Sequence, residues 1–178
     1  FRLHYMRDAS RLFSMPVIVG RKKRSTPIFS HRISYIEFNP YWNVPWRLAV
    51  EDILPKVQRD IGYLRRKNFK VYLGNKVVSP NSINWGSLNK KNFNYRFRQM
   101  PGKSNALGTV KFMFPNKHAV YLHDTPSKRL FNRVLRSESS GCVRVAKPVL
   151  LAETLLEGKL NRSQIAQIFA SQKNKQVR

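Results

Sequence analysis

Two side chains in this sequence are suited to acyl transfer. Cys142 is the only cysteine among the 178 residues, and it follows His123 by 19 positions. A thiolate can attack a carbonyl and form a thioester while an imidazole moves the proton. A lone cysteine is also often a small buried apolar residue. The spacing does not decide between these readings, because 19 residues of chain can bring the two side chains together or hold them apart.

The residues around Cys142 favour a reactive thiol. Cys142 lies in the sequence Ser139-Ser140-Gly141-Cys142-Val143-Arg144, which is polar where a buried structural thiol would have aliphatic neighbours. Gly141 permits a tight turn, so the backbone N–H groups of Gly141 and Cys142 are the predicted donors to an oxyanion. In a strand, Arg144 would share the face of Cys142 and favour the thiolate. Ser139 and Ser140 are predicted to line the site, with capping of the loop as the alternative.

The residues before Cys142 predict how the imidazole is held. The alternating run over residues 119–123 is typical of a strand, which fixes His123 on a rigid element. Tyr121 lies on the same face and is expected either to contribute its hydroxyl to the site or simply to pack. Because successive strand side chains point to opposite faces, Asp124 is not expected to be the third member of a triad.

These motifs resemble a known family. His123-Asp124-Thr125 with Ser139 to Arg144 is similar to the active-site signature of L,D-transpeptidases, the YkuD-like catalytic domain. Further segments resemble the large periplasmic subgroup typified by YcbB, and the similarity extends over about residues 1–157: Pro16-Val17-Ile18-Val19-Gly20, Thr26-Pro27-Ile28-Phe29-Ser30, Phe38-Asn39-Pro40-Tyr41-Trp42-Asn43-Val44-Pro45 and Asn105-Ala106-Leu107-Gly108. Many members have Ser-His-Gly-Cys, whereas this chain has Ser140 in place of that histidine.

The resemblance implies a fold, an activity and a location. The fold is mixed and mainly β, a YkuD-like β-sandwich or open barrel with a helical-and-loop insertion and C-terminal helices. The activity is peptidoglycan 3→3 cross-linking, with Cys142 as nucleophile, His123 as general base and acid, and Arg144 holding a stem carboxylate or bracing the loop. The partners are a donor tetrapeptide stem and an acceptor amine, carbapenems are expected to acylate Cys142, and no cofactor or metal is implied. The location is the periplasm, compatible with a membrane anchor outside this chain.

Three alternatives stay open. Water as acceptor would make the protein an L,D-carboxypeptidase, and a protein amine would make it an anchoring enzyme. The formal charge of +25 also fits a cationic module that binds polyanions without chemistry. Residues 61–123 contain twelve Lys or Arg and no Asp or Glu, interleaved with aromatic rings. Such a pattern can hold single-stranded nucleic acid or steer the carboxylates of peptidoglycan. A specific nucleic-acid ligand is not expected.

The organisation predicted along the chain is one catalytic domain over residues 1–178, excised from a longer protein. About residues 46–99 are expected to form a substrate cap, in which Trp85 contacts ligand or anchors the insertion to the main body. The basic run 21–24 is expected to be a water-exposed loop. Residues 58–67 and 149–156 are expected to be helical, a capping box of Asn161 and Gln164 begins the last helix, and the tail after residue 172 is expected to be frayed.

Overall fold

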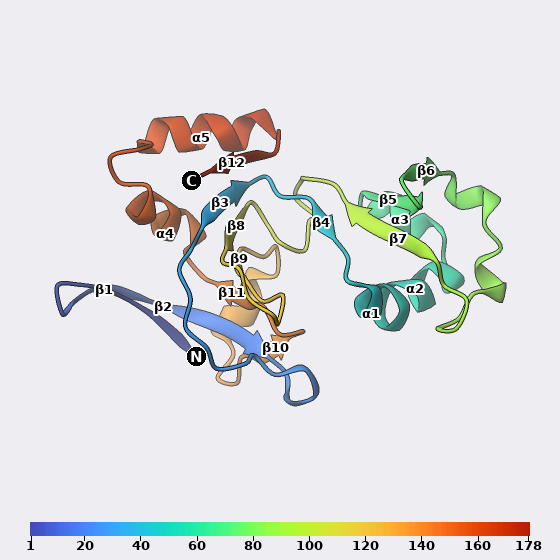
Figure 1. Cartoon of the computed structure of the whole chain (residues 1–178), viewed down its shortest axis with the longest axis horizontal. Helices are drawn as coiled ribbons and strands as arrows, with labels where there is room; N and C mark the ends of the chain where they lie inside the picture. The colour runs from blue at the N-terminus through green and yellow to red at the C-terminus, as the bar shows by residue number, and fades with distance from the viewer. The chain divides into compact units, whose positions relative to one another are not determined.

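The computed structural model describes all 178 residues and divides them into two compact units (Figure 1). The main unit comprises residues 1–40 and 106–178, and the inserted unit comprises residues 41–105. Each unit has its own sheet and its own apolar core. The predicted class is confirmed, because the chain is mainly β with two sheets and a few helices.

The main unit is built on one eight-stranded sheet. Seven strands follow the order β1-β2-β11-β9-β8-β3-β12, and β10 pairs with β2. The strands are β1 (Arg2–Arg7), β2 (Ser10–Gly20), β3 (Tyr35–Phe38), β8 (Val110–Met113), β9 (Leu122–His123), β10 (Ser137–Ser139), β11 (Val143–Val145) and β12 (Lys175–Val177). Two helices, α4 (Pro148–Leu155) and α5 (Arg162–Ser171), and two 3₁₀ turns, Lys22–Arg24 and Lys128–Asn132, complete the unit.

One face of this sheet carries the core. Alternation along β3 and β8 turns Ile36, Phe38, Val110 and Phe112 to this face, where each is almost completely buried. The helices α4 and α5 contribute Leu151, Ala152, Ile165 and Ile168 to the same cluster, and Leu156, directly after α4, joins them. The polar residues between these apolar positions therefore point to the opposite face of the sheet.

The opposite face carries a row of mostly polar residues across six strands. Register pairs join Gln176 to Glu37, Glu37 to Lys111, Lys111 to His123, His123 to Arg144 and Arg144 to Ile18. Paired residues on neighbouring strands project from the same face. The sheet thus lines up four ionisable side chains, and the two catalytic candidates lie within or beside this row.

The C-terminal segment corrects one prediction and confirms another. Asn161 and Gln164 form the expected capping box at the start of α5. The tail is not frayed, because β12 pairs with β3. Asn174 Nδ2 also donates to Glu37 Oε1 at 2.8 Å, and Asn39 Nδ2 donates to the Lys173 carbonyl at 3.1 Å. The long-range asparagine contacts that hold the tail have no signal in its local composition.

The inserted unit combines short helices with a second sheet. Helices α1 (Trp46–Leu48), α2 (Leu54–Arg59) and α3 (Gly62–Arg66), with a π-helical turn at Ala49–Ile53, pack with strands in the order β4-β7-β5-β6. These strands are β4 (Trp42–Asn43), β5 (Phe69–Leu73), β6 (Lys76–Val78) and β7 (Tyr95–Gln99), and 3₁₀ turns occupy Pro80–Ser82 and Trp85–Ser87. The single helix predicted over residues 58–67 is wrong, because Asp60 is extended and its Oδ1 accepts a hydrogen bond from the Gly62 N–H.

The aromatic residues of the inserted unit form its core. Trp85 is 7% exposed, stacks with Phe97 at a centroid distance of 6.0 Å, and donates from Nε1 to the Pro80 carbonyl. Its predicted ligand contact is therefore corrected, since this ring stabilises the unit from within. Phe93 and Phe97 are also buried, whereas Arg96 on the same strand is exposed. The interleaving seen in the sequence separates rings and cations onto opposite faces of β7, which leaves these buried rings unavailable for stacking with bases.

Candidate active site

Two adjacent parallel strands bring Cys142 and His123 to one face of the main sheet. The Val143 N–H donates to the Tyr121 carbonyl at 3.1 Å, and His123 pairs with Arg144. Cys142 directly precedes β11 and Tyr121 directly precedes β9. Alternation then projects the side chains of Tyr121, His123, Cys142 and Arg144 from the same face. The rings of Tyr121 and His123 meet edge to face, with centroids 5.6 Å apart.

The imidazole is held in one tautomer. His123 is 5% exposed, and its Nδ1 lies 2.5 Å from the backbone carbonyl of Asp124. A carbonyl only accepts, so Nδ1 carries the proton and Nε2 keeps its lone pair. Burial and the positive charge of Arg144 lower the pKa of His123 to about 3. The ring is therefore neutral at neutral pH and able to accept a proton.

The thiol is partly exposed and is protonated at rest. Cys142 Sγ lies 3.9 Å from the Ala119 carbonyl, to which it donates. Burial raises the pKa of the Cys142 thiol, while hydrogen bonding from Tyr121 and the charges of Lys111 and Arg144 act in the opposite direction. A raised thiol pKa beside a lowered imidazole pKa means a neutral pair. The arrangement suits proton transfer during attack rather than a preformed thiolate.

The turn before Cys142 is braced from inside. Gly141 has φ +119, a conformation that side chains rarely adopt. Its N–H donates to Ser139 Oγ at 3.1 Å, and that hydroxyl donates to the Cys142 carbonyl at 2.5 Å. Ser139 is 2% exposed. The predicted oxyanion role of the Gly141 N–H is corrected, because this group is already bonded. For Ser139, the contacts favour the alternative of capping the loop over lining the site. The Cys142 N–H makes no hydrogen bond within the chain and remains the oxyanion-donor candidate.

The basic run after β2 contacts this turn. Ser140 Oγ accepts hydrogen bonds from Arg24 Nη1 at 3.0 Å and from Arg21 Nη2 at 3.4 Å. Thr26 Oγ1 donates to the Gly141 carbonyl at 2.8 Å. The run was expected to be a water-exposed loop, and Arg21, Lys22 and Lys23 are exposed, but both arginines also contact this turn. No sequence signal indicates these contacts, since the two segments are more than 110 residues apart.

Arg144 is a cation without a partner in the structure. Its side chain makes no ion pair, and its buried Nε has no hydrogen-bond acceptor. Burial lowers the pKa of Arg144, against the opposing effect of Glu138 and Cys142. Of its two predicted roles, bracing the loop has no contact to support it. A partly buried guanidinium beside the thiol is suited to bidentate binding of a carboxylate.

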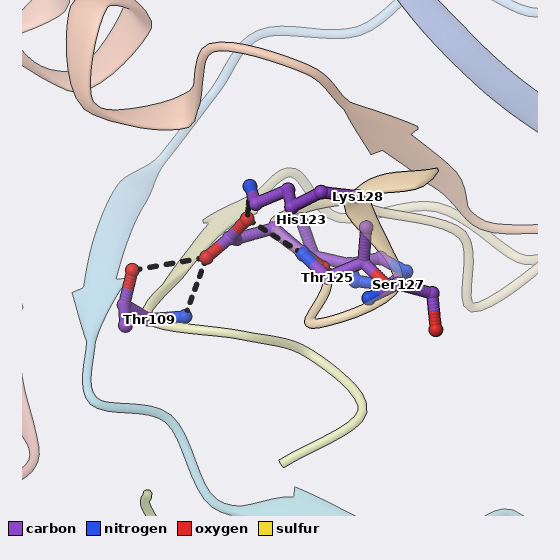
Figure 2. A network of polar contacts seen from close by, with 6 residues as sticks. Thr109, His123, Thr125, Ser127 and Lys128 are labelled. Atoms are coloured by element: carbon purple, nitrogen blue, oxygen red, sulfur yellow. Dashed lines mark hydrogen bonds and ion pairs between the residues drawn. The ribbon is translucent and has the colours of Figure 1, made fainter. Parts of the chain in front are cut away.

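Asp124 supports the site through its backbone and side chain separately. Figure 2 shows the side-chain contacts: Oδ2 accepts from the Thr109 N–H and Oγ1, both at 3.0 Å, and Oδ1 accepts from the Thr125 N–H and pairs with Lys128. The carboxylate therefore does not orient His123, as the strand alternation predicts. It fixes the peptide whose carbonyl does.

The family follows from the sequence comparison. The family model of YkuD, described as the L,D-transpeptidase catalytic domain, matches residues 1–165. This chain belongs to that family. A protein of Haemophilus influenzae named "Putative L,D-transpeptidase" is 46% identical over 159 residues. That match covers 88% of this chain and 32% of the relative, so the chain spans about a third of that relative's length.

Other features of this L,D-transpeptidase domain bear on its chemistry. No group of three or more His, Cys, Asp or Glu side chains is arranged to hold a metal ion. None of the helices is both long and apolar enough to span a bilayer. Lys111, which the prediction of the site missed, projects from the same face of the sheet as His123. Its signal was present in the alternation of Val110-Lys111-Phe112, which separates the lysine from the core.

The buried imidazole predicts a pH-dependent stability. The unfolded chain binds a proton at His123 below its ordinary pKa of 6.5, whereas the folded protein binds it only near 3. Lowering the pH through this window therefore favours unfolding. From pH 7 to 4.5, His123 should remove about 2 to 3 kcal/mol from the free energy of unfolding. Urea unfolding of the wild type and His123→Gln across this range measures it. Parallel pH dependences in the two proteins would contradict the buried neutral imidazole.

Proposed function

We propose that the domain is a peptidoglycan L,D-transpeptidase that forms 3→3 cross-links through a thioester on Cys142. The observation that carries this proposal is the β9–β11 pairing. It places a partly exposed thiol on the same face of the sheet as an imidazole whose Nδ1–H is fixed. An imidazole in this tautomer presents Nε2 as the base. The family acts on peptidoglycan peptides, which supply the carbonyl and the amine.

The first half-reaction forms the thioester. As Cys142 Sγ attacks the carbonyl carbon joining the third and fourth stem residues, His123 Nε2 takes the thiol proton. The Cys142 N–H donates to the oxyanion, and loss of such a donor costs about 3 to 4 kcal/mol. The tetrahedral intermediate collapses by breaking the C–N bond. The leaving D-Ala amine takes the proton from His123, which returns the ring to its neutral form.

The second half-reaction resolves the thioester. An acceptor amine from another stem attacks the thioester carbon, and His123 Nε2 takes a proton from that amine. Collapse breaks the C–S bond, and the proton returns to Cys142. Arg144 is placed to bind a carboxylate of a stem, because its guanidinium is partly buried and unpaired in the chain. Tyr121 contributes hydrogen bonding to the thiolate. Each cycle restores the neutral pair of thiol and imidazole.

The same thioester would serve other acceptors. Water would give an L,D-carboxypeptidase and a protein amine an anchoring enzyme, and the acceptor depends on the shape of the groove and on exclusion of water. A cationic module without chemistry is the candidate of a different class, motivated by the charge of +25. A binding module of this kind would not explain why the His123 tautomer is fixed or why Arg144 has no ion-pair partner.

The finer assignments belong to the same proposal. We assign the chain to the large YcbB-type subgroup and to the periplasm, with carbapenems as covalent inhibitors. Residues 41–105 form a compact unit within the chain, and we propose that this insertion is a substrate cap. The relative is about three times as long as this chain, so the activity and partners of a whole protein of that length are part of the proposal.

Product analysis tests the proposed reaction. The purified domain is incubated with tetrapeptide-containing muropeptides, and the product masses are measured. A dimer formed with loss of one D-Ala supports transpeptidation, whereas a tripeptide monomer alone would support the carboxypeptidase. An unchanged tetrapeptide would contradict both. Strong salt-dependent binding of an oligonucleotide that Cys142→Ala leaves intact, without any product, would favour the binding module.

A further inference from the structure

Lys111 is a largely buried cation on the catalytic face, and the proposed mechanism does not use it. Its side chain is 15% exposed, although it belongs to a strand whose neighbours Val110 and Phe112 are in the core. Burying an ammonium is costly unless a partner offsets the lost hydration. The groups around Lys111 must therefore explain how a charged side chain is stabilised at this position.

The surroundings hold the ammonium in one place. Lys111 Nζ lies 3.6 Å from Glu37 Oε2 and 4.5 Å from the centroid of the Tyr121 ring. Glu37 is itself 7% exposed, and its other oxygen accepts from Asn174 Nδ2 at 2.8 Å. The amide of the C-terminal tail thus fixes the carboxylate, the carboxylate fixes the ammonium, and the ammonium rests against the ring.

The row of paired residues across the sheet places Lys111 next to His123, on the face that also carries Cys142. Lys111 on β8 is the register partner of His123 on β9, and Glu37 on β3 is one strand farther away. Neighbouring strands are about 4.8 Å apart, so the ammonium is nearer to the site than the carboxylate that pairs with it. The other groups facing the pair are Tyr121 directly before β9, Arg144 on β11, and Ile18 and Gln176 farther along the row.

We propose that Lys111 is a positioning residue of the active site, which holds the Tyr121 ring and places a fixed positive charge beside Cys142 and His123. This proposal deepens the proposed function and rests on it. The charge favours the thiolate that forms during attack, and it favours the neutral imidazole that must accept the proton. The same charge lowers the pKa of both Cys142 and His123, which agrees with the geometry.

The alternative is an ion pair that only supports the fold. A buried pair of this kind often contributes little net stability compared with apolar residues of similar size. The two readings differ in one observable. If the pair is purely structural, replacing it by apolar side chains leaves the ionisation of Cys142 unchanged. If Lys111 is a positioning charge, removing that charge raises the pKa of the thiol.

The test measures ionisation of the thiol directly. The rate of alkylation of Cys142 by iodoacetamide is followed from pH 6 to 10 in the wild type, Lys111→Met, Lys111→Arg and Lys117→Met. Removing a charge close to the thiol should move the midpoint of the profile upward by about one unit in Lys111→Met. Lys111→Arg keeps a positive charge at this position and should return the midpoint most of the way to the wild-type value. Lys117→Met, an exposed lysine of the next loop, should not move it.

Two further measurements keep the result decisive. Because Lys111→Met leaves Glu37 buried and unpaired, Glu37→Leu/Lys111→Met removes both charges and should fold while keeping the shift. Acylation of these variants by a tetrapeptide donor at pH 7 should fall about tenfold, the rate equivalent of about one pKa unit. An unchanged alkylation profile in either folded variant overturns the proposal, as does a shift that arginine fails to reduce. Alkylation needs no peptidoglycan, so its outcome is independent of the proposed reaction.

Discussion

Cys142→Ala and His123→Gln each reduce formation of cross-linked muropeptides by about 10⁴-fold or more. The first removes the atom that carries the acyl group. The second keeps a side-chain amide able to donate to the Asp124 carbonyl, but it has no lone pair of suitable basicity to accept the thiol proton. The double variant should be no slower than either single one, because both residues act in the same step. Product formation is measured by chromatography and mass spectrometry of digested muropeptides.

Matched variants separate chemistry from stability in that experiment. Lys117→Ala and His118→Ala each shorten an exposed side chain in the loop that precedes β9. Both should retain activity within about threefold, since surface changes rarely exceed about 0.5 kcal/mol. Cys142→Ala should keep the melting temperature of the wild type, because the thiol is partly exposed and its contact with the Ala119 carbonyl is long. Cross-linking that persists in Cys142→Ala would exclude the thioester.

Gly108→Ala should destabilise the main unit by about 2 to 4 kcal/mol, combining backbone strain with a steric clash. Gly108 has φ +62, and a Cβ there would lie 2.3 Å from Asp124 Oδ2. Relief requires Asp124 to move, which disturbs its bonds to Thr109 and Thr125 and the carbonyl that holds His123. Cross-linking activity should therefore fall even at temperatures where the variant is folded. Urea unfolding and initial rates measure the two effects.

Gly158→Ala is the matched control for this prediction. Gly158 has φ +80 with nothing within 4 Å of a built Cβ, so it shares the backbone strain without the clash. Its substitution should cost about 1 kcal/mol and leave the activity unchanged. If the two glycine variants lose equal stability and keep equal activity, the packing of Gly108 against Asp124 does not support the site.

The sequence allowed the centre of the site to be predicted because local rules decide it. Alternation placed His123 and Tyr121 on one face and excluded the Asp124 carboxylate as the orienting group, and the capping box marked the start of the last helix. The same rules could have separated Lys111 from the core of its strand. Each of these predictions depends on residues within a few positions of one another.

The missed features depend on contacts between distant segments or on competition between bonds. The tail after residue 172 is polar, yet Asn174 reaches Glu37 across 137 positions and β12 completes the sheet. Arg21 and Arg24 look like solvated charges until the fold brings Ser140 to them. The Gly141 N–H was predicted to donate to an oxyanion, but in the fold it donates to Ser139 Oγ, and the sequence does not show that this side chain competes for it. Trp85 was predicted to contact ligand or to anchor the insertion to the main body, while its ring fills a core assembled from β5, β7 and the helices.

The central claim is that Cys142 carries the acyl group in a covalent intermediate. Intact-mass spectrometry of the domain after incubation with a carbapenem, or with a tetrapeptide donor quenched at short times, tests it most directly. The account predicts a mass increase equal to one acyl group on the wild type, mapped to the peptide containing Cys142, and none on Cys142→Ala. No adduct on the wild type, or an equal adduct on Cys142→Ala, would contradict it.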